Sequence, residues 1–191
     1  GGVTIVHRNA TRHAVNVRVR QAIGRPEDQI APGEPLLVLQ NIYEIDTYNG
    51  EAVTFLGWEI DGAFGSPVLV EDYWTKAKEP LHFGLARVQL REGDPALAVL
   101  CPEQVFGMTT KMQIGDKAVA LAGRAWVSKA APETVEYVDV WDVRLGEYVP
   151  KAVWPPLLNS NFGYAYTAHK MQGSPAPGVL VILEPTVKLG F

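Results

Sequence analysis

The sequence is poor in cysteine and lacks long apolar runs, and each absence excludes a class of protein. Cys101 is the only cysteine, which excludes an intrachain disulfide and a metal site with several thiolate ligands. No set of His and Cys residues has zinc-binding spacing. No apolar run approaches the about 20 residues that a membrane-spanning helix needs, and the N-terminus shows no signal-peptide pattern. We therefore expect a cytoplasmic protein with no membrane partner and no metal site.

The sequence also lacks the motifs that transfer phosphoryl groups. It contains no Gly-x-x-x-x-Gly-Lys-Ser/Thr phosphate loop and no Asp followed directly by Glu, the pair that would hold a magnesium ion. Phosphoryl transfer needs such groups, because they hold the phosphates and the metal. We predict that this polypeptide alone contains no catalytic residue for ATP hydrolysis.

Charge is distributed unevenly along the chain, although the net charge is only −4. Residues 1–25 contain five arginines and no acid, whereas residues 26–72 contain ten acids and no Lys or Arg. Residues 151–191 again carry an excess of two positive charges. One interpretation is a basic domain that is split in sequence and holds an acidic insert, in which case a polyanion would meet the ends of the chain. The alternative is that the blocks of charge arise by chance.

Both ends of the chain have the pattern of an α/β domain. The β-branched run 3–6 predicts a strand, and the spacing of apolar residues predicts a helix over 10–23. Asn9 or Thr11 is expected to cap this helix and Gly24 to end it. At the other end we expect a short helix over 164–171 and a central parallel strand, covered on both faces, over 179–183.

Arginines recur along the first expected helix. Arg12, Asn16 and Arg20 fall on one face, at a spacing of four residues. We interpret Arg18, Arg20 and Arg25 as a solvated face.

The middle of the chain has a different pattern, in which short strand-like runs alternate with turns. Asn49-Gly50 is a strong signal for a tight turn. No long helical pattern intervenes, so a small antiparallel barrel or sandwich is expected, with an edge strand over 134–143. The expected strands are 36–39, 52–56, 66–70, 81–90, 97–100, 117–126 and 134–143.

One late stretch, Gly163-Tyr-Ala-Tyr-Thr-Ala-His-Lys-Met-Gln-Gly-Ser174, gathers polar residues within an apolar region. It closely resembles motif V of superfamily 1 DNA helicases, and in particular the branch that contains the alpha subunit of exonuclease V and the Dda-type phage helicases. In that family the region has the pattern Gly-Tyr-Ala-x-Thr-x-His-Lys-x-Gln-Gly-Ser, followed by a Val-rich strand. The matching residues are Gly163, Tyr164, Ala165, Thr167, His169, Lys170, Gln172, Gly173 and Ser174.

Two further segments are similar to the same family, with lower specificity. Residues 5–16 look like the strand-to-helix segment that opens the second motor domain. Residues 33–41, together with 48–50, look like the start of an inserted SH3-like domain. The resemblance implies a second RecA-like domain that is split in sequence and interrupted by a small SH3-like antiparallel barrel. Its parts would be residues 1–28, 29–152 and 153–191.

The resemblance also implies roles for individual residues. Single-stranded DNA would be bound through its phosphates by hydroxyl, amide and cationic groups, which grip the strand without reading bases. An ATP cleft, with its Mg²⁺, would be completed by an N-terminal RecA-like domain of the parent chain, and translocation would run 5′ to 3′. The expected DNA-binding residues are Arg8, Asn9, Arg12, Thr167, His169 and Lys170, and those coupled to the ATP cleft are Gln172, Gly173 and Ser174.

The sequence departs from the family after Ser174, where Pro175-Ala-Pro177 replaces an acidic or aromatic residue. This departure weakens the case for a nucleotide contact from that turn. The inserted barrel would touch the displaced DNA strand or the junction, or dock on another helicase domain. Its acidity favours protein contact, which includes other repair or replication proteins. The alternative function is a non-enzymatic β-barrel module that binds a partner protein. We interpret Glu136, Asp139, Asp142 and Glu147 as solvated charges, not as a nuclease metal cluster.

Overall fold

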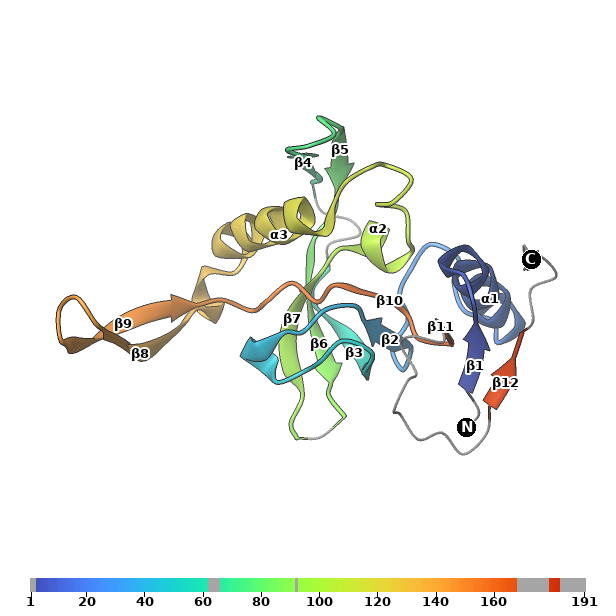
Figure 1. The fold of residues 1–191 in the computed structure, drawn as a ribbon, viewed down its shortest axis with the longest axis horizontal. Coiled ribbons are helices and arrows are strands. Elements are labelled where there is room, and N and C mark those ends of the chain that lie inside the picture. Colours follow the sequence, from blue (N-terminus) through green and yellow to red (C-terminus); the bar gives the residue numbers. More distant parts are fainter. Residues whose placement is uncertain (1–2, 62–65, 92, 168–178, 183–191) are drawn as a thin grey trace, which may run out of the picture.

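The computed structural model describes residues 3–61, 66–91, 93–167 and 179–182, and it shows a mixed α/β protein built from several small sheets (Figure 1). Within these ranges, no helix is both long enough and apolar enough to cross a membrane.

The two ends of the chain meet in one parallel sheet of three strands. β1 (Val3–Val6) lies between β11 (Ala165–Thr167) and β12 (Val179–Val181), and it is parallel to both. The strand expected at 3–6 is therefore confirmed, and the parallel strand expected over 179–183 is confirmed over 179–181. However, β12 lies at an edge of this sheet and its Leu180 is exposed, so the expectation of a covered central strand is wrong. The helix expected over 164–171 is also wrong where the structure describes it, because residues 165–167 pair with β1 as a strand.

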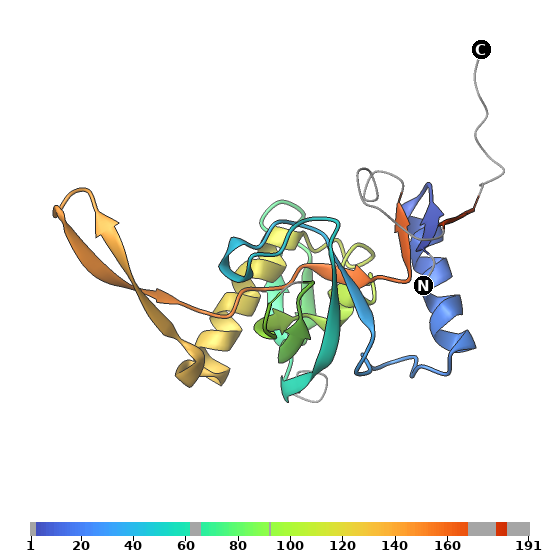
Figure 2. The same ribbon diagram turned by 90° about the horizontal axis from the view of Figure 1, so that it is seen from below.

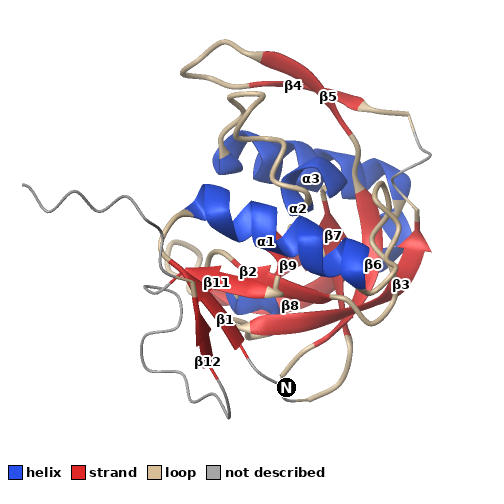
Figure 3. Ribbon diagram, turned by 90° about the vertical axis from the view of Figure 1, so that its right-hand side faces the viewer, coloured by secondary structure: helices blue, strands red, loops and turns tan. Residues whose placement is uncertain are grey.

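The helix expected near the N-terminus is α1 (Asn9–Ala22), which packs against β1 and β11 (Figure 3). Gly24 ends it as expected: φ is +70° there, and its N–H donates to the carbonyl of Gln21 at 3.1 Å. The N–H of Arg25 donates to the carbonyl of Arg20 at 2.8 Å, which completes a Schellman motif. The expected cap is wrong, because Arg8 occupies the N-cap position and no side chain caps the first turn.

A five-stranded sheet, with the strand order β10-β2-β3-β6-β7, forms the centre of the molecule. Its neighbouring strands are antiparallel. Its core gathers Leu36, Phe55, Val88, Leu100 and Leu158, each fully buried. Its strands are β2 (Pro35–Val38), β3 (Ala52–Ile60), β6 (Gly84–Gln89), β7 (Ala96–Leu100) and β10 (Ser160–Phe162).

The described strands do not close into the expected barrel. β7 meets the segment before β10 only at an isolated parallel bridge, between Val99 and Leu157. Between β2 and β3, the 3₁₀ turn η1 (Tyr43–Ile45) precedes the Asn49-Gly50 turn, where Gly50 has a φ of +95°.

Helices also occur in the middle of the chain, so the expectation of an all-β insert is wrong. α2 (Pro102–Val105) is a single turn, and α3 (Asp116–Ala130) replaces the strand expected over 117–126. α3 buries Val119, Gly123 and Val127, which lie at helical spacing on one face. This face packs on a second core that includes Phe83 and Leu85.

Two hairpins complete the described structure. β4 (Val68–Glu71) pairs with β5 (Lys78–Leu81) near the start of α3. After the 3₁₀ turn η2 (Pro132–Thr134), β8 (Glu136–Asp142) pairs with β9 (Glu147–Val153) in a hairpin that projects from the body (Figure 2). The expected edge strand over 134–143 is therefore one arm of a two-stranded sheet.

Candidate nucleic-acid interface

Three of the sequence-predicted residues meet at one edge of the parallel sheet. Thr167 is the last residue of β11 and lies opposite Val6, the last residue of β1. After β1 and His7, Arg8 is the N-cap of α1 and Asn9 is its first residue, so both continue from the same edge. Ligands of open α/β sheets bind outside the carboxyl ends of the strands. This edge is therefore the candidate interface.

The N-terminus of α1 gives this edge a positive electrostatic character. Arg8 is the N-cap residue, and the first turn contains no acidic residue and no side-chain cap. The first N–H groups of a helix and its dipole both favour an anion. Arg8 and Asn9 are exposed, whereas Thr167 is only 9% exposed. In the described part, the helix terminus and its two exposed side chains therefore face solvent at this edge.

Arg12 was expected to bind DNA, but the structure places its side chain inside the protein. The residue is 4% exposed, and its Nη2 donates to Oδ1 of Asn161 at 2.6 Å. The Nδ2 of Asn161 donates in turn to the carbonyl of Gln104 at 2.6 Å. Burial lowers the pKa of Arg12 from its ordinary value. In this arrangement, Arg12 ties α1 to the strand that leads into the candidate interface.

Asn16, one turn further along α1, holds the segment between β10 and β11. Its Nδ2 donates to the carbonyl of Phe162 at 2.7 Å, and its Oδ1 accepts from the N–H of Ala165 at 2.9 Å. β10 pairs with β2 and β11 pairs with β1, so the chain changes sheets between residues 162 and 165. Asn16 supplies both a donor and an acceptor to backbone groups at this crossing.

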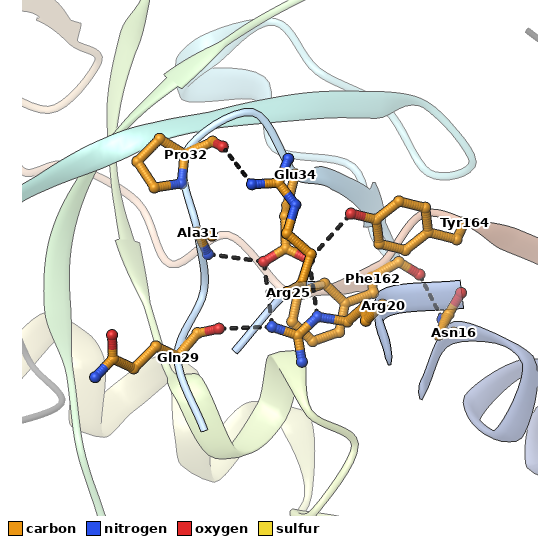
Figure 4. Close-up of polar contacts among 9 residues, drawn as sticks. All are labelled: Asn16, Arg20, Arg25, Gln29, Ala31, Pro32, Glu34, Phe162 and Tyr164. Atoms are coloured by element: carbon orange, nitrogen blue, oxygen red, sulfur yellow. Dashed lines mark hydrogen bonds and ion pairs between the residues drawn. The ribbon is translucent and has the colours of Figure 1, made fainter. Parts of the chain in front are cut away.

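Arg20 and Glu34 form a buried ion pair at the other end of the same face (Figure 4). The Nε and Nη2 of Arg20 donate to the two carboxylate oxygens of Glu34 at 2.7 and 3.2 Å, and Nη2 also donates to the carbonyl of Gln29 at 2.6 Å. The guanidinium lies 4.1 Å from the ring centroid of Phe162. The interpretation of Arg20 as a solvated residue is therefore wrong.

Tyr164 links this ion pair to the strand that ends at Thr167. Its hydroxyl donates to Oε1 of Glu34 at 3.0 Å, and the N–H of Ala31 donates to the other oxygen at 2.7 Å. Burial raises the pKa of Tyr164, and the carboxylate of Glu34 raises it further. The phenol therefore stays protonated and remains a donor at neutral pH.

Sequence reasoning missed these positioning residues, although part of the signal was visible. The spacing of Arg12, Asn16 and Arg20 marks one helical face, but a polar helical face is ordinarily exposed. Glu34 and Tyr164 carry no local signal for their role, because their partners are distant in sequence.

The remaining predicted site residues, His169, Lys170, Gln172, Gly173 and Ser174, lie outside the described residues. Across the ranges that are described, no group of three or more His, Cys, Asp and Glu side chains could hold a metal ion. Comparison with models of known families finds no match, and comparison with curated proteins finds none either.

Proposed function

We propose that this chain is the C-terminal part of an ATP-dependent superfamily 1 DNA helicase. It grips single-stranded DNA and forms one side of an ATP cleft that an N-terminal RecA-like domain of the parent chain completes, together with ATP and Mg²⁺. The observation that carries the proposal is the Gly163–Ser174 stretch, with nine residues that match the helicase motif. The path of β11 supports the proposal. This strand begins inside the stretch, runs parallel to β1 and ends beside the start of α1.

The chemistry at this edge suits a phosphate backbone. The N-terminus of α1 offers backbone N–H groups and a favourable dipole, and Arg8 adds a positive charge. In the sequence, His169 and Lys170 follow Thr167 by two and three residues, and they add an imidazole and a cationic group to this set. These groups recognise phosphate and sugar and carry no base-specific information. The proposed grip is therefore indifferent to the sequence of the strand.

A fluorescence-anisotropy titration with a labelled single-stranded oligonucleotide, repeated over a range of salt concentrations, tests this proposal. Each phosphate that a cationic side chain neutralises contributes about 0.7 to the slope of log K against log salt for single strands. Replacing Thr167, His169 and Lys170 together by alanine should weaken binding and lower this slope by about 0.7 for each phosphate that is no longer neutralised. Arg8→Ala should lower it by a similar amount.

Arg91→Ala is the matched control, because Arg91 is exposed and lies in the loop between β6 and β7. It removes the same charge away from the candidate interface and should leave the slope unchanged. If Arg91→Ala lowers affinity as much as Arg8→Ala does, binding is a general effect of charge and the proposed edge is wrong. If no affinity appears even at low salt, the alternative of a protein-interaction module is favoured.

A further inference from the structure

The β8–β9 hairpin exposes an unusual amount of apolar surface. Its two strands pair only with each other among the described sheets, and it extends away from the body of the molecule (Figures 1 and 2). An isolated two-stranded hairpin is at best marginally stable in water. Contiguous exposed apolar surface commonly marks an interaction site. The exposed apolar side chains of this hairpin are Tyr137, Val138, Val140, Trp141, Val143, Leu145 and Tyr148.

The register places aromatic residues on one face of the hairpin. Trp141 lies opposite Tyr148, and their rings meet edge to face with centroids 5.2 Å apart. Trp141 is nevertheless 52% exposed and Tyr148 is 68% exposed. Tyr137 falls on the same face as Trp141, because it lies four residues earlier in the strand. This pair stiffens the hairpin, but most of its apolar surface remains open to a partner.

The charges of β8 are of one sign. The strand carries Glu136, Asp139 and Asp142 and contains no basic residue. These carboxylates repel nucleic acid and anionic lipid. The same charges attract a protein segment that combines apolar and basic side chains.

The two edges of the hairpin differ in their capacity to pair with another strand. β9 contains Pro150, which has no N–H to donate, and prolines within sheets occur on edge strands. β8 contains no proline and has no second partner strand among the described residues. The free edge of β8 is therefore the edge at which a further strand can add with full backbone pairing.

We propose that the β8–β9 hairpin binds an extended protein segment that is both apolar and basic, which adds along β8 as a third strand. Backbone hydrogen bonds supply general affinity in this kind of recognition, and alternate side chains supply specificity. Basic residues of the segment would lie beside Glu136 and Asp142, which share the face opposite the aromatic one, and its apolar residues would cover the aromatic face. This interaction goes beyond the proposed DNA grip and does not rest on it.

Two synthetic peptides of equal length test this inference, one alternating valine with lysine and the other alternating valine with glutamate. The complete chain should bind the lysine peptide about tenfold more tightly than the glutamate peptide in fluorescence anisotropy, because several cross-strand charge pairs change sign together. The double variant Glu136→Lys/Glu147→Lys changes two exposed acids on this face and keeps the turn contacts of Asp142, and it should reverse this preference. Hydrogen exchange at the amides of residues 136–142 should slow when the preferred peptide is bound.

The double variant Glu44→Lys/Asp94→Lys is the matched control, because it makes the same change in net charge at two exposed acids outside the hairpin. It should keep the preference for the lysine peptide. Equal binding of both peptides, binding of neither, or binding without slower exchange in β8 overturns the proposal. Hairpin-dependent self-association, or hairpin-dependent binding to single-stranded DNA or anionic vesicles, assigns this surface to a different occupant and also overturns it.

Discussion

Replacing Arg20 by methionine is the sharpest test of the polar face of α1. Methionine keeps a long side chain of similar volume and removes only the guanidinium. The carboxylate of Glu34 is fully buried and would lose both donors from Arg20, keeping only the hydroxyl of Tyr164 and the N–H of Ala31. The carbonyl of Gln29 would also lose its donor from Arg20.

The expected loss of stability is large compared with the stability of a typical domain. Removing one partner of a buried ion pair costs about 3–5 kcal/mol, because the remaining charge is uncompensated. The free energy of unfolding of a typical domain is about 5–15 kcal/mol. Arg20→Met should therefore lower the free energy of unfolding by about 3–5 kcal/mol, and this change is measurable by urea denaturation followed by circular dichroism.

Two further variants separate the ion pair from other effects of the substitution. Arg18→Met changes an exposed arginine of the same helix and should shift the free energy of unfolding by less than about 0.5 kcal/mol. Arg20→Met combined with Glu34→Gln removes both charges and keeps an acceptor for the N–H of Ala31, so it should be more stable than Arg20→Met alone. If Arg20→Met is no more destabilising than Arg18→Met, or if the double variant recovers nothing, the ion pair does not hold α1 in place.

Two other substitutions test local features of the fold. Gly24→Ala should lower the free energy of unfolding by about 1–2 kcal/mol, because Gly24 has a positive φ and open space around it. Gly107→Ala should lower it by more, because a Cβ at Gly107 would also overlap the imidazole of His13. Equal losses in urea denaturation would contradict this prediction. Asp72→Asn should destabilise at neutral pH, since the backbone N–H groups of Thr75 and of Gly115, which precedes α3, hold the pKa of Asp72 below its usual range. Because the pKa of Asp72 is lower in the folded state, its carboxylate stabilises the fold above its ordinary pKa, and this stabilisation is lost as the pH falls through the folded-state pKa. The free energies of unfolding of the wild type and of Asp72→Asn should therefore converge in acid. A difference between them that does not change with pH would refute this assignment.

The N-terminal strand and helix could be predicted from sequence because their signals are local. The β-branched run 3–6, the apolar spacing of α1 and the αL glycine at its end each act within a few residues. The buried face of α1 could not be assigned in the same way. Its side chains pair with residues up to 149 positions away, and a polar side chain shows no sign of such a partner in its own neighbourhood.

The two errors in element type have different physical origins. The strand expected over 117–126 conflicts with a sequence that is rich in alanine, the residue with the strongest helix propensity, and in which Val119, Gly123 and Val127 recur at helical spacing. The signal for α3 is therefore local and readable from the sequence. By contrast, residues 165–167 form a strand because β1 offers a parallel partner, and this pairing is not visible in the local sequence.

The polar face of α1 follows from what the helix must cover. Between Phe162 and Ala165 the chain leaves one sheet and joins another, so backbone groups there cannot be satisfied by strand pairing alone. An apolar helix face would bury these groups without partners, at a cost of about 1–3 kcal/mol for each. Asn16 supplies the missing donor and acceptor, and Arg20 with Glu34 fixes the adjacent Tyr164. The position of β11, and with it the candidate interface at its carboxyl end, is therefore set by a buried polar contact between the two ends of the chain.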